Sequence, residues 1–311
     1  MPACPPRRLR LLPTAVLALV LAWPLAGCSP PSLPFARLAG LVTDPELDEI
    51  SGLAASRRHP GVLWAHNDSG NPARLYAIST RGRVLARLDL AGIANVDWED
   101  LAAFALDGRD YLLVADTGDN GGLRHGIALH AVEEPARLRS GTLRPAWTLR
   151  ARWPDGPRDV EAVAVDAAAG QVLLISKKRQ PPELFVLPLR AAEGQILEPR
   201  RIGRLAGVPQ ADAALRRRDP ALARLYAQVT AADLAPDGRT LAVLTYANVL
   251  FYRRAEGEDW GRAVARAPEV HALPLLPQAE ALAWTPGGAG LYASGEFRPA
   301  PIYYLSPDPA P

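Results

Sequence analysis

Short apolar stretches, broken by Gly, Pro, Asn and Asp, make up most of this sequence from about residue 37 onward. Such stretches predict β-strands, because strands are short and are bounded by residues that favour turns. Turn sequences such as Pro236-Asp237-Gly238 and Pro286-Gly287-Gly288 lie between neighbouring stretches and predict hairpins. The pattern therefore predicts an all-β fold.

One segment, residues 212–227, has a different periodicity. Leu215, Leu222 and Leu225 alternate with arginines at helical spacing. Proline lacks a backbone donor and disrupts a helix interior, so we expect a short helical insertion that is interrupted near Pro220.

A four-residue pattern recurs along the chain, and each copy begins a predicted strand. The copies are Glu99-Asp100-Leu101-Ala102, Glu161-Ala162-Val163-Ala164 and Glu280-Ala281-Leu282-Ala283, with Ser51-Gly52-Leu53-Ala54 and Thr230-Ala231-Ala232-Asp233 as weaker ones. In four copies a second apolar stretch starts 11 residues later, and in the Glu99 copy it starts one residue later still. A third stretch follows every time.

Five copies of an antiparallel meander predict the blades of a β-propeller, in which neighbouring blades bury each other's faces. The last copy ends after its third strand, and residues 38–43 would supply the missing outer strand and close the ring. We predict five blades. An undetected sixth blade and a β-sandwich with a fortuitous repeat are the alternatives.

The N-terminus has the order of a bacterial signal peptide. Arg7, Arg8 and Arg10 precede an apolar run over residues 11–22, which is too short for a permanent membrane-spanning helix. The next residues, Leu25-Ala26-Gly27-Cys28, resemble the lipobox of bacterial lipoproteins. The resemblance implies cleavage before Cys28 and acylation of its thiol. An ordinary secretory signal with a chance cysteine is the alternative.

Three segments follow from this interpretation: a signal peptide (1–27), a lipidated, proline-rich tether (28–36) and one propeller domain (37–311). Ser29 implies, by the same resemblance, an outer-membrane lipoprotein that faces the periplasm. Cys4 lies in the removed segment, so the mature chain has no disulfide and depends on its buried core.

The charge of the mature chain gives no reason to expect nucleic-acid binding. Removal of the three N-terminal arginines changes the formal net charge from +2 to −1. We expect a monomer whose partners are the membrane, through the lipid anchor, and a small-molecule or envelope-protein ligand.

In a propeller the inner strands begin, and the second strands end, at the same mouth of the central channel. The predicted strand starts carry Glu49, Ser51, Asp97, Glu99, Asp159, Glu161, Thr230 and Glu280. The second strands end in segments that contain His66, Asn67, Asp68, Asp116, Lys177, Lys178, Tyr246 and Glu296. Carboxylates in one narrow opening repel each other, and a hard divalent cation with about six to eight oxygen ligands would neutralise them.

This mouth is the predicted functional site. The expected metal ligands are Glu49, Asn67, Asp97, Glu99, Asp159, Glu161, Glu280 and Glu296, with Ca²⁺ as the ion and Mg²⁺ as the second choice. Lys177, Lys178, Tyr246 and Arg298 would hold an anionic group such as phosphate. The candidate catalytic residues are His66, Asp68 and Asp116, with His66 as a general base toward metal-bound water.

A simpler interpretation of the same residues stays open. The acids can be solvated channel walls or strand caps, the lysines can merely pair with them, and His66 can be structural.

Several motifs resemble bacterial propellers of the esterase-like phytase and SdiA-regulated type. They are Leu47-Asp48-Glu49-Ile50-Ser51-Gly52-Leu53-Ala54, Leu63-Trp64-Ala65-His66-Asn67-Asp68-Ser69-Gly70, Asp97-Trp98-Glu99-Asp100, Ala115-Asp116-Thr117-Gly118-Asp119-Asn120 and Thr230-Ala231-Ala232-Asp233 with Pro236-Asp237-Gly238-Arg239. The resemblance covers most of residues 45–300. It implies a propeller that binds several Ca²⁺ ions and, from the phytases, hydrolysis of phosphate esters; those enzymes have six blades.

Two functions of different classes remain. The sequence has no Gly-x-Ser-x-Gly elbow, no His-Glu-x-x-His and no P-loop, which argues against serine hydrolases, zincins and NTPases. The first function is binding of a small anionic ligand at a cation-binding mouth, extended to metal-dependent hydrolysis of a phosphate ester, ester or lactone. The second is a non-catalytic interaction scaffold in the cell envelope.

The lipobox predicts that Cys28→Ala abolishes acylation and releases the protein from the membrane fraction, because no thiol remains to accept the lipid. Metabolic labelling with a fatty acid and cell fractionation measure both effects, and Cys4→Ala is the control. A Cys28→Ala variant that still labels and sediments with membranes would contradict the lipoprotein interpretation.

Overall fold

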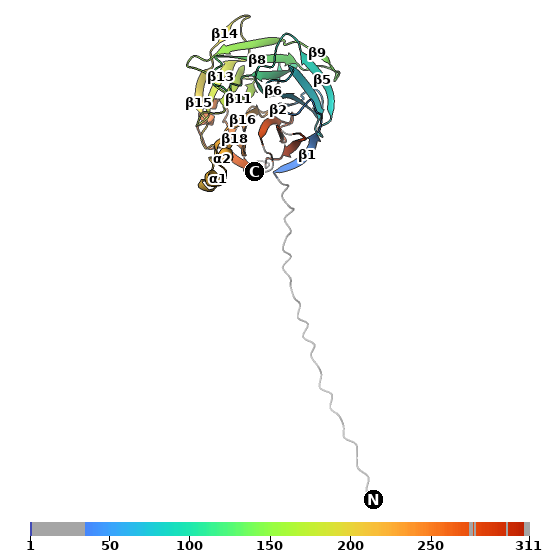
Figure 1. The fold of residues 1–311 in the computed structure, drawn as a ribbon, viewed down its shortest axis with the longest axis vertical. Helices are drawn as coiled ribbons and strands as arrows, with labels where there is room; N and C mark the ends of the chain where they lie inside the picture. Colours follow the sequence, from blue (N-terminus) through green and yellow to red (C-terminus); the bar gives the residue numbers. More distant parts are fainter. Residues whose placement is uncertain (2–34, 274–275, 277, 297, 308–311) are drawn as a thin grey trace. The chain divides into compact units, whose positions relative to one another are not determined.

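The computed structural model describes residues 1, 35–273, 276, 278–296 and 298–307. From residue 35 onward the chain forms five separate sheets arranged in a ring (Figure 1). The predicted five-bladed β-propeller is confirmed. The sandwich and the sixth blade are wrong, because each repeat contributes one sheet and the five sheets account for every described strand.

Blades 1 to 5 are numbered by their inner strands in chain order. Blade 1 contains β2 (Ile50–Ala55), β3 (Val62–Asn67), β4 (Arg74–Ser79) and β5 (Val84–Leu90). Blade 2 contains β6 (Trp98–Leu106), β7 (Arg109–Asp116), β8 (Gly126–Glu133) and β10 (Trp147–Arg152). Blade 3 contains β11 (Val160–Asp166), β12 (Gln171–Ser176), β13 (Glu183–Pro188) and β15 (Arg200–Arg204). Blade 4 contains β16 (Val229–Leu234), β17 (Thr240–Thr245), β18 (Asn248–Arg253) and β19 (Glu269–Ala272).

Blade 5 closes the ring with strands from both ends of the chain. It contains β20 (Ala279–Trp284), β21 (Leu291–Gly295), β22 (Ala300–Leu305) and the N-terminal β1 (Ala36–Val42). β1 pairs antiparallel with β22, from Ala36 opposite Leu305 to Val42 opposite Ala300. The predicted closure is therefore confirmed, and backbone hydrogen bonds hold the first strand in the last blade.

Two very short strands were not expected from the sequence. β9 (Gly141–Leu143) pairs in parallel with β5 of blade 1, and β14 (Ile196–Leu197) pairs in parallel with β10 of blade 2. Each lies in a connection of the following blade and covers the outer edge of the preceding one. An exposed strand edge can pair with another chain, so these segments protect the edges they cover.

The predicted helical insertion is confirmed as α1 (Ala213–Arg218) and α2 (Pro220–Leu225). The side chain of Asp219 caps α2, and Pro220 is its first residue, where a missing donor costs nothing. Neither helix has a buried residue. A third helix, α3 (Trp260–Ala263), was not predicted. Within the described part of the chain, no helix has the length and apolar character needed to cross a membrane.

The hydrophobic core lies between neighbouring blades. Each inner strand contacts the next around the ring, and β20 contacts β2. One cluster joins β2 of blade 1 to blade 5 through Leu53, Ala281 and Ile302, all fully buried. Because both faces of every blade are covered in this way, the second strands carry continuous apolar runs such as Val172-Leu173-Leu174-Ile175.

One carboxylate ties three blades together at the axis. Asp100 of β6 is fully buried, and its Oδ2 accepts hydrogen bonds from the backbone N–H of Val163 (2.8 Å) and of Ala232 (3.1 Å). These donors belong to β11 and β16. Its Oδ1 accepts a third bond from the N–H of Leu101 (2.8 Å). Burial raises the pKa of Asp100 well above its ordinary value.

The other repeats have a small residue at the position of Asp100: Gly52, Ala162, Ala231 and Ala281. Five equivalent positions converge near the axis, which leaves room for one longer side chain. Gly52 also admits the His66 ring, since a Cβ there would lie 2.2 Å from His66 Nε2. Asp233 makes a similar link between blades 4 and 5, where its Oδ2 accepts from the Trp284 N–H (2.7 Å).

Asp100→Ala should lower the free energy of unfolding by about 2–4 kcal/mol, because the N–H groups of Val163 and Ala232 would be buried without an acceptor. Urea denaturation measures the loss. Asp100→Asn is the matched variant: its amide oxygen can still accept both cross-blade bonds, so it should lose less. Equal urea midpoints for wild type and Asp100→Ala would show that this carboxylate does not hold the blades.

Candidate metal centre

Every inner strand has a β-bulge at the same position. The pairing of inner and second strands skips one residue in each blade, namely Ser51, Glu99, Glu161, Thr230 and Glu280. A bulge bends the strand and re-aims the side chain of the extra residue. These residues are the first members of the sequence repeat. The repeat therefore encodes a ring of bulged side chains around the channel mouth.

The two hydroxyl members of this ring connect blades. Ser51 Oγ donates to the backbone oxygen of Glu99 (2.7 Å), and Thr230 Oγ1 donates to that of Ala279 (2.6 Å). Both acceptors lie on the next inner strand. The other three positions of the ring are Glu99, Glu161 and Glu280. Carboxylates are therefore the ring members that remain to interact at the channel mouth.

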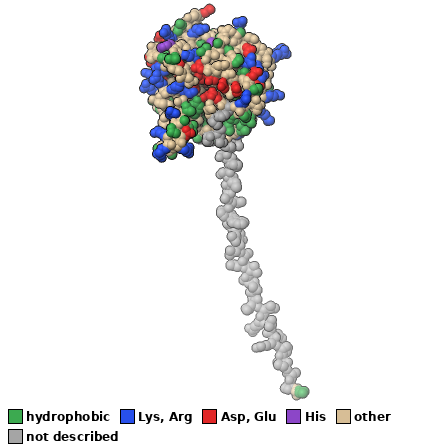
Figure 2. Space-filling model, in the orientation of Figure 1, with side chains coloured by type: hydrophobic (Ala, Val, Ile, Leu, Met, Phe, Trp, Pro, Cys, Tyr) green, Lys and Arg blue, Asp and Glu red, His purple; other side chains and the backbone are tan. Residues whose placement is uncertain are grey.

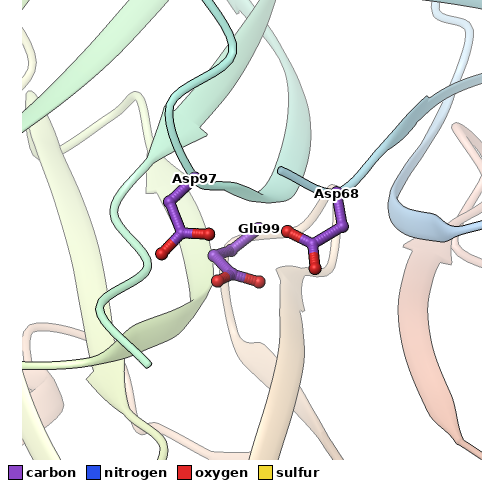
Figure 3. Close-up of side chains that lie close together, drawn as sticks. All are labelled: Asp68, Asp97 and Glu99. Atoms are coloured by element: carbon purple, nitrogen blue, oxygen red, sulfur yellow. The ribbon is translucent and has the colours of Figure 1, made fainter. Parts of the chain in front are cut away.

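Two groups of carboxylates meet there and share Glu99. One contains Asp68, Asp97 and Glu99, and the other contains Glu99, Asp159 and Glu161. Within each group the candidate ligand oxygens lie within 4.8 Å of one another. In Figure 3 the three carboxyl groups of the first group point toward one another.

A cavity of about 340 Å³ opens above these groups, and acidic side chains gather on the same face in Figure 2. Its lining combines blades 1 to 5 with the end of the helical insertion: Asp68, Glu99, Asn120, Glu161, Lys177, Lys178, Leu225, Gln228, Tyr246, Gln278, Glu280 and Glu296.

Glu99 is buried without a full set of partners. Its residue is 3% exposed, Oε1 has no hydrogen-bond donor among the described residues, and Oε2 receives only a long bond from Ser51 Oγ (3.4 Å). Burial, followed by the charges of Glu161 and Asp68, raises the pKa of Glu99 well above its ordinary value. Burial also raises the pKa values of Asp68 and Asp97. For Asp68, Asp97 and Glu99, the nearby positive charges do not outweigh the effect of burial.

Lysines compensate the acids of blade 3. Lys177 pairs with Glu161, and Lys178 Nζ lies 2.8 Å from Asp159 Oδ2. Burial nevertheless raises the pKa of Glu161 to about 8, although the Lys177 ammonium opposes this shift. Lys177 also lies over the ring of Tyr246, 5.4 Å from its centre.

The acids of blade 5, Glu280 and Glu296, each accept a hydrogen bond from a neighbouring side chain. The Tyr246 hydroxyl donates to Glu280, and Gln278 Nε2 donates to Glu296 Oε2 (2.9 Å). Burial and the neighbouring Glu280 raise the pKa of Glu296 to about 8. Glu280 and Glu296 line the cavity but lie outside both carboxylate groups described above.

Some predicted site residues have other partners. His66 is fully buried, and its ring nitrogens face the backbone oxygens of Asn67 (3.0 Å) and Asp100 (3.3 Å). Burial lowers the pKa of His66 to about 4. It does not line the cavity, so the predicted general base has no geometric support. Asp116 Oδ1 is paired with Arg124 (2.7 Å) and also lies away from the cavity lining.

Of the other predicted site residues, Asn67 has a structural role, while Glu49 and Arg298 are exposed. Asn67 holds the preceding loop, because its Nδ2 donates to the Glu46 oxygen (2.8 Å). Glu49 is exposed and accepts from Asn71. Arg298 is exposed and does not line the cavity. The predicted lipidation site, Cys28, lies outside the described residues.

Sequence reasoning missed residues that the repeat itself could have indicated. Gln228 and Gln278 stand two positions before a bulge, as Asp97 and Asp159 do, and both line the cavity. Gly118 also has a role that its motif alone did not indicate. A Cβ at Gly118 would lie 1.9 Å from Glu99 Oε1 and 2.7 Å from Asp97 Oδ2, so only glycine lets the backbone approach this closely.

The fold has solved counterparts. The crystal structure of the major Malassezia sympodialis allergen Mala s 1 matches 88% of this chain and 97% of its own chain, with a TM-score of 0.53 and 12% sequence identity. This likeness concerns the propeller fold alone. Hydrazine synthase of Kuenenia stuttgartiensis matches 78% of this chain and 61% of its own, with 12% identity and a TM-score of 0.37, which is too low to support an argument. No family model matches the sequence, and no curated protein is significantly similar to it.

Gly118→Ala should destabilise the protein by about 1–3 kcal/mol in the presence of a chelator, because the new methyl group forces the Glu99 carboxylate or the backbone to move. Urea denaturation measures the change. Gly121→Ala is the matched control in the same loop, since a Cβ there meets only Leu123 at an ordinary distance of 3.6 Å. If both variants unfold alike, the close approach to Glu99 does not constrain the loop.

Proposed function

We propose that the channel mouth binds a divalent cation, with Ca²⁺ preferred over Mg²⁺. The proposed ligands come from the two carboxylate groups that share Glu99, namely Asp68 and Asp97 on one side of it and Asp159 and Glu161 on the other. The observation that carries the proposal is the buried Glu99, whose Oε1 has no donor among the described residues and whose carboxylate belongs to both groups. A cation is the partner that this arrangement of oxygens would accept.

The energetics of burial support a cation. A buried carboxylate without a partner is costly, and neighbouring carboxylates increase the cost. A divalent ion would offset both effects for Glu99 and its neighbours Asp68 and Asp97. The donors are all oxygens on separate loops and strand starts, an irregular set that suits the flexible coordination of Ca²⁺ better than the octahedral geometry of Mg²⁺.

The proposed role of the bound cation is recognition of a small anionic ligand. Ca²⁺ takes about six to eight oxygens, so exogenous oxygens can complete its coordination from the open side of the mouth. Lys177 and Lys178 line the same cavity and pair with Glu161 and Asp159. Coordination of those carboxylates by a cation weakens their hold on the lysines, which then become available to an anion.

Other parts of the interpretation stay predictions. Hydrolysis of a phosphate ester, ester or lactone, and relatedness to the esterase-like phytase and SdiA-regulated propellers, have no support beyond the sequence motifs. The lipid anchor, the outer-membrane location and the monomeric state are expectations of the same kind. A non-catalytic envelope scaffold is the competing function.

Ca²⁺ should raise the melting temperature of the propeller in a concentration-dependent way. An ion that binds only the folded state stabilises it by RT ln(1 + [L]/Kd), about 2.7 kcal/mol at a hundredfold excess over Kd. Thermal denaturation after chelator treatment, with and without added metal, measures the effect. Glu99→Gln should lose most of it, because both carboxylate groups lose their shared charge.

In chelator, Glu99→Gln should be at least as stable as wild type, since the repulsion among the acids is relieved. Glu256→Gln, at a residue whose side chain is 89% exposed, is the control and should respond to Ca²⁺ like wild type. If Ca²⁺, Mg²⁺ and Mn²⁺ all leave the wild-type melting curve unchanged, the acids are channel walls and the scaffold function takes precedence.

A further inference from the structure

A second cavity, of about 650 Å³, lies beside blade 2 toward the rim of the propeller, where β8 and β14 run in Figure 1. It is an open cleft lined by residues of the segment that leads from blade 1 into blade 2 (Gly92, Ile93, Ala94 and Val96) and by residues of β8, β10 and β14. It shares no lining residue with the channel mouth.

The walls of this cavity are largely apolar. Ile93, Val96, Ile127 and Ile196 are among the lining residues. Val96 is 56% exposed and Ile196 is 64% exposed. Large apolar side chains that are exposed to this degree in the lining of a cleft provide surface for an apolar ligand.

The polar part of the lining is basic. Arg150 and Arg152 alternate along β10 with buried residues, and both are exposed without an ion pair in the described structure. His125 lines the same cavity. Asp116 is the only acid in the lining, and Arg124 already neutralises it at 2.7 Å. The net charge of the cleft is therefore positive.

A buried imidazole reaches the same cavity. His130 is 4% exposed, and its Nδ1 lies 3.0 Å from Thr148 Oγ1. No partner of its Nε2 is found among the described residues. Burial lowers the pKa of His130 to about 4, so the ring is neutral at pH 7. In the tautomer in which the Thr148 hydroxyl donates to Nδ1, the ring proton is on Nε2 and can be donated to a ligand.

We propose that this cleft binds a small monocarboxylate with an apolar body. The apolar body lies between Val96 and Ile196, and the carboxylate faces Arg150 and Arg152. His130 Nε2 donates a hydrogen bond to the carboxylate or to a polar atom next to it. The charge selects an anion, and the apolar walls select against small hydrated anions such as phosphate.

Isothermal titration calorimetry with octanoate tests this site, with 1-octanol as the uncharged probe of the same length. Chelator is present throughout, so the result does not depend on the metal site. Octanoate should bind with a stoichiometry of one, and 1-octanol at least about tenfold more weakly, because it lacks the charge that the guanidinium groups recognise. The Nε2 resonance of His130 should shift with octanoate in ¹⁵N NMR.

Arg150→Glu with Arg152→Glu should weaken octanoate binding at least about tenfold, since both charges that face the ligand are reversed. Arg81→Glu with Arg83→Glu is the matched control, because both arginines are exposed in the hairpin of blade 1 and outside this cavity. Absence of octanoate binding, equal affinity for 1-octanol, or an equal loss in both double variants would overturn the proposal.

Discussion

The inner strands of five blades converge on one axis, and this convergence constrains the rest of the structure. Near the axis, equivalent residues of different blades come so close that four of the five positions hold glycine or alanine. The fifth holds Asp100, whose carboxylate uses the proximity to bond three inner strands. The short distances near the axis leave no room for several large side chains. They also allow one carboxylate to accept hydrogen bonds from the backbone of several blades.

At the channel mouth, the same convergence brings charged side chains close together. A bulge in each inner strand re-aims the first residue of the repeat, and three of these residues are glutamates. Lysines pair with the acids of blade 3 and the Tyr246 hydroxyl donates to Glu280 of blade 5, while one oxygen of Glu99 has no donor among the described residues. Gly118 keeps this arrangement compact. The proposed cation would supply the charge that the chain itself lacks at this point.

The cleft beside blade 2 is basic, whereas the channel mouth is acidic. Arg124 stands between the two sites, since it neutralises Asp116 and donates to the Gly118 oxygen (2.7 Å) in the loop beside Glu99. Arg124 also lines the basic cleft. One guanidinium thus supports the loop of the acidic mouth and contributes to the positive field of the second cavity. The two sites are chemically opposite, yet they share a structural element.

The sequence by itself determined the blades, the ring closure by an N-terminal strand predicted at residues 38–43, and the helical insertion, because short apolar stretches, turn residues and an internal repeat can be recognised along the chain without its tertiary contacts. The same repeat placed Asp97, Glu99, Asp159 and Glu161 at one mouth. The tertiary structure decided which side chains lack partners. His66 and Asn67 share a segment with Asp68, but packing turned the first two toward backbone groups and left Asp68 beside Glu99. Asp100 and Gly118 acquire their roles from other blades and from a neighbouring loop, and hydrogen bonds across such distances in the chain leave no periodic signal.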